Sequence, residues 1–202
     1  ENSLAGRVAD IHYLIPKYKL QIHAEHFQKV THNLLGIKGS KIENIKTVRS
    51  HSHAIGQCQK IIVKNKLKPI VAADTAGSAK YILEKKDKTK AAIASSLSAE
   101  IYDLEIIEKD IQDNKENFTR FLLMGKDIEQ PENDDKSYIT SFLFKLKSKP
   151  AALYSALQGM AINGVNMIKL QSFPEKNSFS SYFFLCEVEG HIDDQKIKNS
   201  LE

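Results

Sequence analysis

The sequence predicts an α/β protein with a second, smaller α/β unit towards its C-terminal end, and two observations support this fold class. Between residues 45 and 103, short apolar runs of strand length alternate with segments whose apolar residues recur at helical spacing, an order typical of a largely parallel sheet. Beyond a polar stretch, residues 138–202 follow the order strand, helix, strand, strand, helix. That order is one strand short of the ferredoxin-like βαββαβ arrangement.

The elements of the first part are predicted from the spacing of their apolar residues. Helical spacing predicts a helix over residues 3–14, which Pro16 ends. Residues 19–30 alternate as in a strand, and residues 35–40 are rich in turn formers. The next elements are expected in this order: a strand at 45–48, a helix at 50–65, a strand at 68–73, a helix at 74–86, a strand at 91–95, a short helix at 96–103, and strands at 104–113 and 118–125.

A polar, acidic stretch with Pro131 at residues 127–137 has the composition of a linker. It separates a domain at residues 1–126 from one at residues 138–202. A Pro at its start and a Gly past its end mark the helix of the second domain. The elements expected there are a strand at 138–148, a helix at 150–164, strands at 165–174 and 179–190, and a helix at 193–202.

The composition is that of a globular protein and argues against several functional classes. With 202 residues, 42% of them hydrophobic, the chain can bury the core of one or two domains. We expect neither a membrane span nor a secretory signal, because the apolar stretches are far shorter than the roughly 20 residues that a membrane helix needs. Cys58 and Cys186 are therefore expected to be reduced thiols in the cytoplasm. Lysines interleaved with acids, and the absence of Trp, argue against nucleic-acid binding.

Two segments combine a short strand, a polar capping residue and a helix whose first turns hold small residues. One surrounds Ser50, and the other surrounds Asp74 and Thr75. Exposed amides at such helix starts attract anions, and in an α/β sheet they line the crevice where ligands bind. Gln57 lies two helical turns after Ser50, so both side chains could face that crevice. The alternative is that both segments are ordinary helix caps.

Histidines and cysteines give no clear signal of metal binding or nucleophilic catalysis. The rings of His51 and His53 are expected to point apart, and no carboxylate or Cys recurs at ligand spacing, so we expect no metal site. His12, His32 and His191 form no pattern. The two cysteines lack the local features of a nucleophile.

The strand that begins at residues 117–121 opens with polar residues, although it continues as an apolar run expected to lie in the core. Alternation places Thr119 on one face of the strand and Arg120 on the other. Arg is rare in this chain, occurring only at positions 7, 49 and 120. A guanidinium in an apolar strand is favoured where a carboxylate must be held by two hydrogen bonds, and equally by a structural ion pair with a neighbouring acid. A position at the mouth of a cleft would explain the polar start.

Several motifs, in order, resemble the prephenate dehydratase family over essentially the whole chain. They are "ENSLAGRV", "IKTVRSHSHAIGQCQKI", "DTAGSAK", "AAIASSLSAEIYDLEII" and "NFTRFLL", followed by "KPAALYSALQGMAINGVNMIKLQSF" and "FFLCEVEGH". The resemblance implies a catalytic domain of two α/β lobes hinged like a type II periplasmic binding protein, here N-terminally incomplete. It also implies an ACT regulatory domain with a ferredoxin-like fold that lacks its last strand.

The implied activity is conversion of prephenate to phenylpyruvate in phenylalanine biosynthesis, with loss of water and carbon dioxide, without a cofactor and in a homodimer. By resemblance, Thr119 is the catalytic hydroxyl that hydrogen-bonds or protonates the leaving group. Phe121 would shield the reacting carboxylate from water, and Arg120 would face a carboxylate. The full set of substrate-binding residues implied is Asn2, Ser3, Ser50, Gln57, Thr75, Arg120 and Phe121.

The regulatory residues implied for L-phenylalanine are Asn166 and residues of two motifs in the second domain. "PAAL" at 150–153 stands where many members have "PGAL", and "QSFP" at 171–174 where many have "ESRP". Gln171 stands where "ESRP" has an acid, and Phe173 stands where it has an arginine. Loss of these two charges should weaken contact with phenylalanine, which is a zwitterion. The residues concerned are Ala151, Ala152, Leu153, Asn166, Gln171 and Ser172. Two alternatives remain open: an arogenate dehydratase, and a non-catalytic protein that senses or binds an amino acid.

Overall fold

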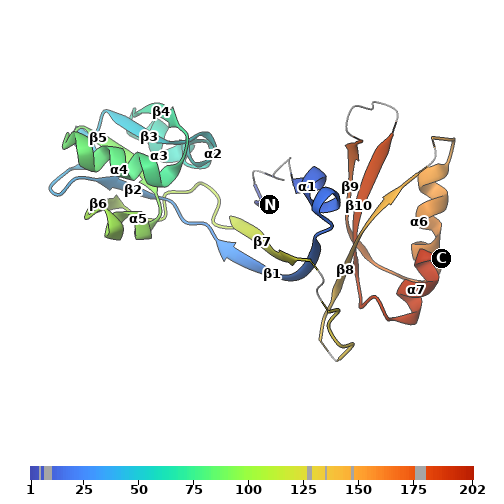
Figure 1. The fold of residues 1–202 in the computed structure, drawn as a ribbon. Helices are drawn as coiled ribbons and strands as arrows, with labels where there is room; N and C mark the ends of the chain where they lie inside the picture. Colours follow the sequence, from blue (N-terminus) through green and yellow to red (C-terminus); the bar gives the residue numbers. More distant parts are fainter. Residues whose placement is uncertain (5, 7–10, 127–128, 135, 147, 176–180) are drawn as a thin grey trace. The chain divides into compact units, whose positions relative to one another are not determined.

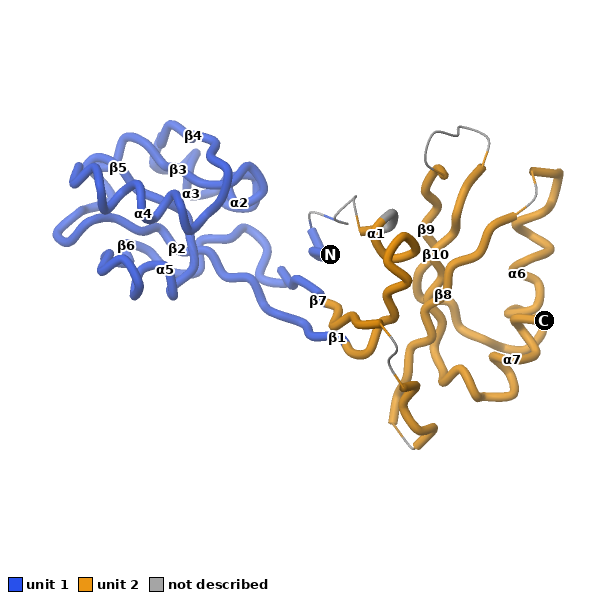
Figure 2. Tube along the Cα trace, viewed as in Figure 1, with its two compact units in different colours: residues 1–8, 25–121 blue, residues 9–24, 122–202 orange. Residues whose placement is uncertain are grey.

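The computed structural model describes residues 1–4, 6, 11–126, 129–134, 136–146, 148–175 and 181–202. The chain divides into two compact units (Figure 2), unit 1 with residues 1–8 and 25–121 and unit 2 with residues 9–24 and 122–202. Both units combine helices with a sheet (Figure 1), so the α/β class is confirmed. In the described part of the chain no helix is both long and apolar enough to cross a membrane.

Unit 1 is built on a five-stranded mixed sheet. Its strands, in spatial order, are β4 (Lys68–Ala72), β3 (Thr47–His51), β5 (Lys90–Ala94), β2 (Asn33–Gly36) and β6 (Glu105–Glu108). The first three strands are parallel, whereas β2 runs antiparallel to both β5 and β6. The expected largely parallel sheet is therefore correct for β4, β3 and β5 only.

Strand β2 is not predicted from the sequence, in which residues 35–40 are rich in turn formers. Its four residues are all buried, and Leu34 and Leu35 are fully inaccessible. A strand of four residues contains too few alternations to reveal a period, and all four of its residues are buried, so exposed polar residues do not mark one face. The mixed sheet follows from this one short strand.

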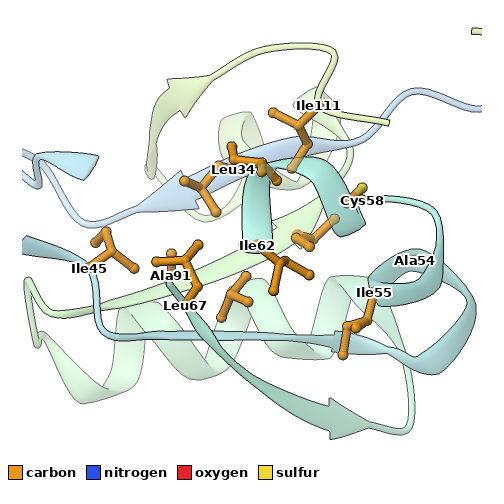
Figure 3. Close-up of a cluster of buried hydrophobic side chains, with 12 residues drawn as sticks. Leu34, Ile45, Ala54, Ile55, Cys58, Ile62, Leu67, Ala91 and Ile111 are labelled. Atoms are coloured by element: carbon orange, nitrogen blue, oxygen red, sulfur yellow. The ribbon is translucent and has the colours of Figure 1, made fainter. Parts of the chain in front are cut away.

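The core of unit 1 lies on both faces of this sheet. Leu34 packs into a cluster with Ile45 and Ile62 (Figure 3). Its neighbour Leu35 packs into a second cluster with Ile82. Successive strand residues point to opposite faces, so the two leucines serve different clusters. The helical segments of this unit are η1 (Ile42–Asn44), α2 (Ser52–Gly56), α3 (Gln59–Lys64), α4 (Thr75–Lys85) and α5 (Ser96–Ile101).

The helix predicted over residues 50–65 is two helices, α2 and α3, with a break at Cys58. The backbone N–H groups of Gln59 and Lys60 donate to the two carboxylate oxygens of Asp113, at 2.8 and 3.1 Å. These bonds satisfy amides that a continuous helix would use internally. The start of α3 is therefore set by a residue more than 50 positions away, which helical periodicity cannot reveal.

Two further strands, β1 (Gln21–Lys29) and β7 (Phe118–Gly125), form a separate two-stranded sheet. The expectation that the later part of β7 lies in the core is wrong, because Phe121 and Leu123 are 55% and 61% exposed. Among the described residues this sheet consists of β1 and β7 only, and two strands by themselves cannot bury the side chains on both of their faces.

The remaining differences in unit 1 and at the start of unit 2 concern element boundaries. The backbones of Asn2 and Gly6 exchange hydrogen bonds of 2.9 and 2.8 Å, so the chain turns where a helix was expected from residue 3. Residues 5 and 7–10 lie outside the described part. Helix α1 (Ile11–Tyr18) contains Pro16 instead of ending there, at the loss of one intrahelical hydrogen bond. Strand β6 ends early, before Asp110, whose φ of 51° leaves the extended region.

Within unit 2, residues 138–202 show the strand, helix, strand, strand, helix order that the sequence predicts for them. The elements of this part are β8 (Ile139–Lys145), α6 (Ala152–Ile162), β9 (Met167–Pro174), β10 (Tyr182–Glu189) and α7 (Gln195–Leu201). The antiparallel sheet has the order β8-β10-β9, and α6 and α7 cover one face of it (Figure 1). Gly159 lets these helices approach, since a Cβ there would lie 2.9 Å from the Ser200 carbonyl oxygen. Met160, Val188 and Ile197 lie in the core beneath them.

Candidate functional site

A pocket of about 330 Å³ lies within unit 1, at the ends of β3 and β4 and beside the start of β7. Three residues proposed from the family motifs as polar cleft positions line it, together with the expected catalytic Thr119. Carboxyl ends of parallel strands are a common place for ligands in α/β proteins. The pocket is lined by Asn2, Val30, His32, His51, His53, Ala54, Gln57, Ala73, Asp74, Thr75 and Thr119.

Thr119 is held at this pocket by Asn2, which lies 117 positions earlier in the sequence. One N–H of the Asn2 side chain is shared between Thr119 Oγ1 at 3.2 Å and the Phe118 carbonyl at 3.1 Å, since the other donates to Asn117. The Asn2 side-chain oxygen accepts from the Leu4 backbone N–H at 3.0 Å. Because Asn2 supplies the donor, Thr119 keeps its own hydroxyl proton for a ligand in the pocket.

A chain of side-chain hydrogen bonds continues from Asn2 into the protein. Asn2 Nδ2 donates to Asn117 Oδ1 at 2.8 Å, and Asn117 Nδ2 donates to Gln57 Oε1 at 2.9 Å. His32 Nε2 lies 2.9 Å from the same Gln57 oxygen. Asn117 is fully buried, so its amide depends on these partners in place of water.

Sequence reasoning overlooked His32 and Asn117 as site residues. Asn117 had a usable signal, because it is two residues before Thr119 and so shares its strand face. His32 had none, since it directly precedes a buried strand that the periodicity did not reveal. Burial lowers the pKa of His32, and its hydrogen bond to Gln57 opposes this lowering to a smaller extent.

The start of α4 brings Asp74 and Thr75 to the pocket but does not form the expected anion site with a free helix end. The Asp74 carboxylate caps the helix by accepting the Gly77 N–H, and Ser78 Oγ donates to the Asp74 carbonyl at 2.8 Å. A carboxylate already occupies the position that an anion would take. Thr75 is the first helical residue and lines the pocket.

Ser50 is not a helix cap. It lies within β3, fully buried, and its hydroxyl donates to the Ile93 carbonyl at 2.6 Å. The cap of α2 is His51, whose ring accepts from the His53 N–H at 3.2 Å. The rings of His51 and His53 meet edge to face with centroids 4.8 Å apart, so the expectation that they point apart is wrong. Among the described residues no group of three His, Cys, Asp or Glu side chains could hold a metal ion.

Arg120, Ser3 and Phe121 do not line the pocket. Arg120 Nε donates to the Glu25 carboxylate at 2.6 Å, and the Glu1 carboxylate lies 3.7 Å from its guanidinium, as in the structural ion pair left open above. Ser3 Oγ accepts from the Phe118 N–H at 3.0 Å and so joins the first residues to β7. Phe121 is more than half exposed on β7.

The residues implied for regulation lie in unit 2. Ala151 is the N-cap of α6 and has a left-handed backbone, φ 59°, a conformation that favours Gly. The Asn166 amide donates to the Glu189 carboxylate at 2.9 Å. Gln171 and Ser172 point to opposite faces of the sheet, and Gln171 Oε1 is buried without a hydrogen-bond partner among the described residues. Ala152 and Leu153 form the first turn of α6.

Burial also decides the state of the two cysteines. It raises the pKa of Cys58 to about 12, with a further contribution from the Asp113 carboxylate, and raises that of Cys186 to about 11. Both thiols therefore stay protonated at neutral pH and pack as small apolar side chains. Neither lines the pocket.

Comparisons with known proteins agree on one family. The family model described as Prephenate dehydratase matches residues 1–129. The chain is 41% identical to a bifunctional N-acyl-homoserine lactone acylase/prephenate dehydratase of Komagataeibacter europaeus, 37% to a prephenate dehydratase of Methanocaldococcus jannaschii and 35% to arogenate dehydratase 2 of Petunia hybrida. All of this chain is covered in each case, and 72%, 74% and 54% of the respective relatives.

Solved structures support the same assignment. One, described as GqqA, a novel type of quorum quenching acylase, has a TM-score of 0.89 and 42% identity, with 100% of this chain and 73% of that chain covered. Another, prephenate dehydratase from Arthrobacter aurescens in complex with L-Phe, has a TM-score of 0.82 and 29% identity, with 90% and 60% covered. With a family model over residues 1–129 and relatives of this similarity, the chain belongs to the prephenate dehydratase family.

Proposed function

We propose that this chain is a prephenate dehydratase that forms phenylpyruvate, and that Thr119 donates to the departing hydroxyl of the substrate. The observation that carries this proposal is the direction of the Asn2 hydrogen bond, which leaves the Thr119 proton available in a pocket lined by polar groups. Membership of the family supports the same reaction.

The reaction requires two bonds to break on opposite sides of the ring. The ring carboxylate leaves as carbon dioxide, the electron pair of its C–C bond completes the aromatic ring, and the C–O bond to the ring hydroxyl breaks. The departing oxygen takes up one proton, which comes from solvent, and leaves as water. Thr119 is a poor acid, so its contribution is a positioned hydrogen bond that strengthens as negative charge develops on that oxygen.

The substrate is a dianion, and the pocket offers several polar groups to its carboxylates. Gln57, Thr75, His51 and His53 line the same space as Thr119. Among the described residues Gln57 Nε2 makes no hydrogen bond within the protein, so it is a donor available to a ligand. Direct contacts of Ser3, Ser50, Arg120 and Phe121 with substrate stay predictions from the family resemblance. For Arg120, such contact would compete with its bond to Glu25.

The architecture implied by the family belongs to this proposal as well. We assign residues 138–202 to an ACT domain, supported by the βαββα order of unit 2. We further expect the two-lobed catalytic domain, the domain boundaries at 126 and 138, a cytoplasmic homodimer, and no cofactor. Sedimentation or light scattering of the purified chain tests the dimer, and a monomer at micromolar concentration would contradict it.

Regulation by L-phenylalanine at the ACT domain is part of the proposal. A relative of 29% identity has been solved in complex with L-Phe. In this chain the unpartnered Gln171 oxygen is an acceptor for the ligand ammonium group, although "QSFP" lacks the charges of "ESRP". Calorimetric titration with L-phenylalanine should show binding, and an absence of heat at millimolar ligand would refute it.

Arogenate is the nearest competing substrate, since a Petunia hybrida relative is named an arogenate dehydratase. Its side chain carries an ammonium group where prephenate has a ketone. Steady-state kinetics with both compounds decide between them. An N-acyl-homoserine lactone belongs in the same substrate panel because of the bifunctional Komagataeibacter europaeus relative.

The deciding experiment measures phenylpyruvate formation from prephenate by its ultraviolet absorbance in alkali. Thr119→Ala should lower kcat/KM at least about a hundredfold, equivalent to about 2.7 kcal/mol of transition-state stabilisation. Thr119→Ser retains a hydroxyl and serves as the matched control, with a smaller loss. Equal activity of the parent and Thr119→Ala would refute the role of Thr119. A folded parent without turnover would favour the non-catalytic amino-acid-binding alternative.

A further inference from the structure

The orientation of the hydrogen-bond chain at the pocket is fixed by backbone groups at one end. The Leu4 backbone N–H can only donate, so the atom of Asn2 that faces it is the side-chain oxygen. The Phe118 carbonyl can only accept, so the atom facing it is the Asn2 nitrogen. Asn2 therefore has one amide orientation that satisfies both neighbours.

Each later link in the chain follows from this first one. Asn2 Nδ2 faces the Asn117 oxygen, which leaves the Asn117 nitrogen facing Gln57. The Gln57 atom that accepts this bond is Oε1, and the same atom lies 2.9 Å from His32 Nε2. An oxygen that cannot donate requires a donor opposite it, so His32 must carry a proton on Nε2.

His32 is itself held firmly at this position. Its backbone N–H donates to Gln112 Oε1 at 2.9 Å, and its carbonyl accepts from the Ile111 N–H at 2.8 Å. The residue is 7% exposed. Its ring therefore meets Gln57 from a fixed side, and burial lowers its pKa so that the ring is neutral.

The consequence appears on the pocket side of Gln57. Oε1 uses both of its lone pairs on Asn117 and His32, so the Gln57 N–H₂ group is the part that remains for a ligand. If the Gln57 amide were rotated by 180°, its N–H₂ group would face the donors of Asn117 and His32, and its carbonyl oxygen would face the pocket. A carbonyl there would repel an anionic substrate.

We propose that His32 is a positioning residue whose Nε2–H, together with the Asn117 side-chain amide, holds the Gln57 amide with its N–H₂ group directed at the substrate. The catalytic consequence rests on the proposed dehydratase function. The hydrogen-bond orientation itself does not, and it can be measured separately.

The first arm of the test uses ¹⁵N NMR of the histidine rings in the full chain. We expect His32 to show the neutral Nε2–H tautomer at pH 7 and 8, with its signals assigned by their loss in His32→Gln. An Nδ1–H tautomer would overturn the proposal, since the Gln57 oxygen would then face an unprotonated nitrogen. The NMR measurement needs no substrate, so its result remains valid even if the protein has no activity on prephenate.

The second arm compares two substitutions of His32 in the phenylpyruvate assay. His32→Gln keeps an N–H donor within reach of Gln57, and we expect kcat within about threefold of the parent. His32→Met removes the donor, and we expect kcat to fall at least about tenfold. His26→Met, at an exposed position of β1, controls for the substitution itself. Equal kcat for His32→Met and the parent would overturn the proposal, as would equal losses in the Gln and Met variants.

A double-mutant cycle separates positioning from a general structural role. In a Gln57→Ala background, His32→Met should cause little further loss of kcat, because its effect passes through the Gln57 amide. In a Thr75→Ala background, His32→Met should lower kcat by the same factor as in the parent, because Thr75 makes no hydrogen bond to Gln57 or His32 among the described residues. Additive losses with Gln57→Ala would refute action through Gln57. If the parent forms no phenylpyruvate, the proposed function fails, and the tautomer measurement alone decides the role of His32.

Discussion

Asn117→Asp is the substitution that tests the buried hydrogen-bond chain most sharply. The two side chains have the same shape, but Asp lacks the N–H₂ group that donates to Gln57 Oε1 at 2.9 Å. In the folded chain an ionised carboxylate at this fully buried position would place two acceptors against each other. The new carboxyl should therefore remain protonated, because its hydroxyl can then donate to Gln57.

The magnitude follows from the cost of holding that proton. An ordinary Asp has a pKa of about 3.9, so keeping it protonated at pH 7 costs about 4 kcal/mol, and at pH 5 about 1.5 kcal/mol. The folded-state pKa is raised above the unfolded value. The variant is therefore close to the parent in stability near pH 4 and loses about 1.4 kcal/mol relative to it for each pH unit above that.

The measurement is urea unfolding followed by circular dichroism at pH 5, 6 and 7, with the parent at each pH. Asn114→Asp is the matched control: this residue is exposed, and its side-chain oxygen accepts from the Glu116 N–H at 2.9 Å, which Asp can also do. We expect the control to match the parent at every pH. A loss in Asn117→Asp that is below about 1 kcal/mol at pH 7, or that does not change with pH, would refute the orientation derived for this chain.

Two further predictions concern other parts of the protein. Ala151→Gly should stabilise the chain by about 0.5–1 kcal/mol, because relief of the left-handed backbone outweighs the entropy of an extra Gly. Ala156→Gly, in the interior of α6, should destabilise it by about 1 kcal/mol, and stability changes of the same sign for the two variants in urea unfolding would contradict this account. Cys58 and Cys186 should react with a disulfide reagent at pH 8 only after unfolding, because burial raises both pKa values. Thiols of the unfolded chain ionise above about pH 8.5, so the free energy of unfolding should decrease as pH rises past that value. Rapid labelling of the folded chain would contradict this prediction, because it would show that the thiols are accessible.

Local patterns predicted the parts of this protein whose signal lies within a few neighbouring residues. The order of elements in unit 2 and the alternation of strands and helices after residue 45 are examples, because side-chain periodicity is set by the backbone of each element itself. The family motifs identified Thr119, and alternation placed it on the face opposite to Arg120. In the structure Thr119 lines the pocket and Arg120 pairs with Glu25 elsewhere.

Contacts between distant residues decided what local patterns could not. Whether Arg120 binds a ligand or forms an ion pair within the protein depended on the position of Glu25, which lies 95 residues away in the sequence. The break before α3 depended on Asp113, and the burial of Ser50 on the neighbouring strand β5. In each case the partner is chosen by packing, and no spacing within one element encodes it.

By itself the sequence determined the α/β class, the elements of unit 2, the family and the residue that carries the proposed chemistry. Only the tertiary structure decided which side chains form hydrogen bonds with Thr119 and with its neighbours in the pocket. Asn2, Gln57 and His32 come together around Asn117 across sequence separations of up to 115 residues, and the donor direction of the whole set follows from two backbone groups. In a buried network each donor must face an acceptor, so the direction of one hydrogen bond depends on the directions of the others. The type of a single residue therefore does not specify the direction.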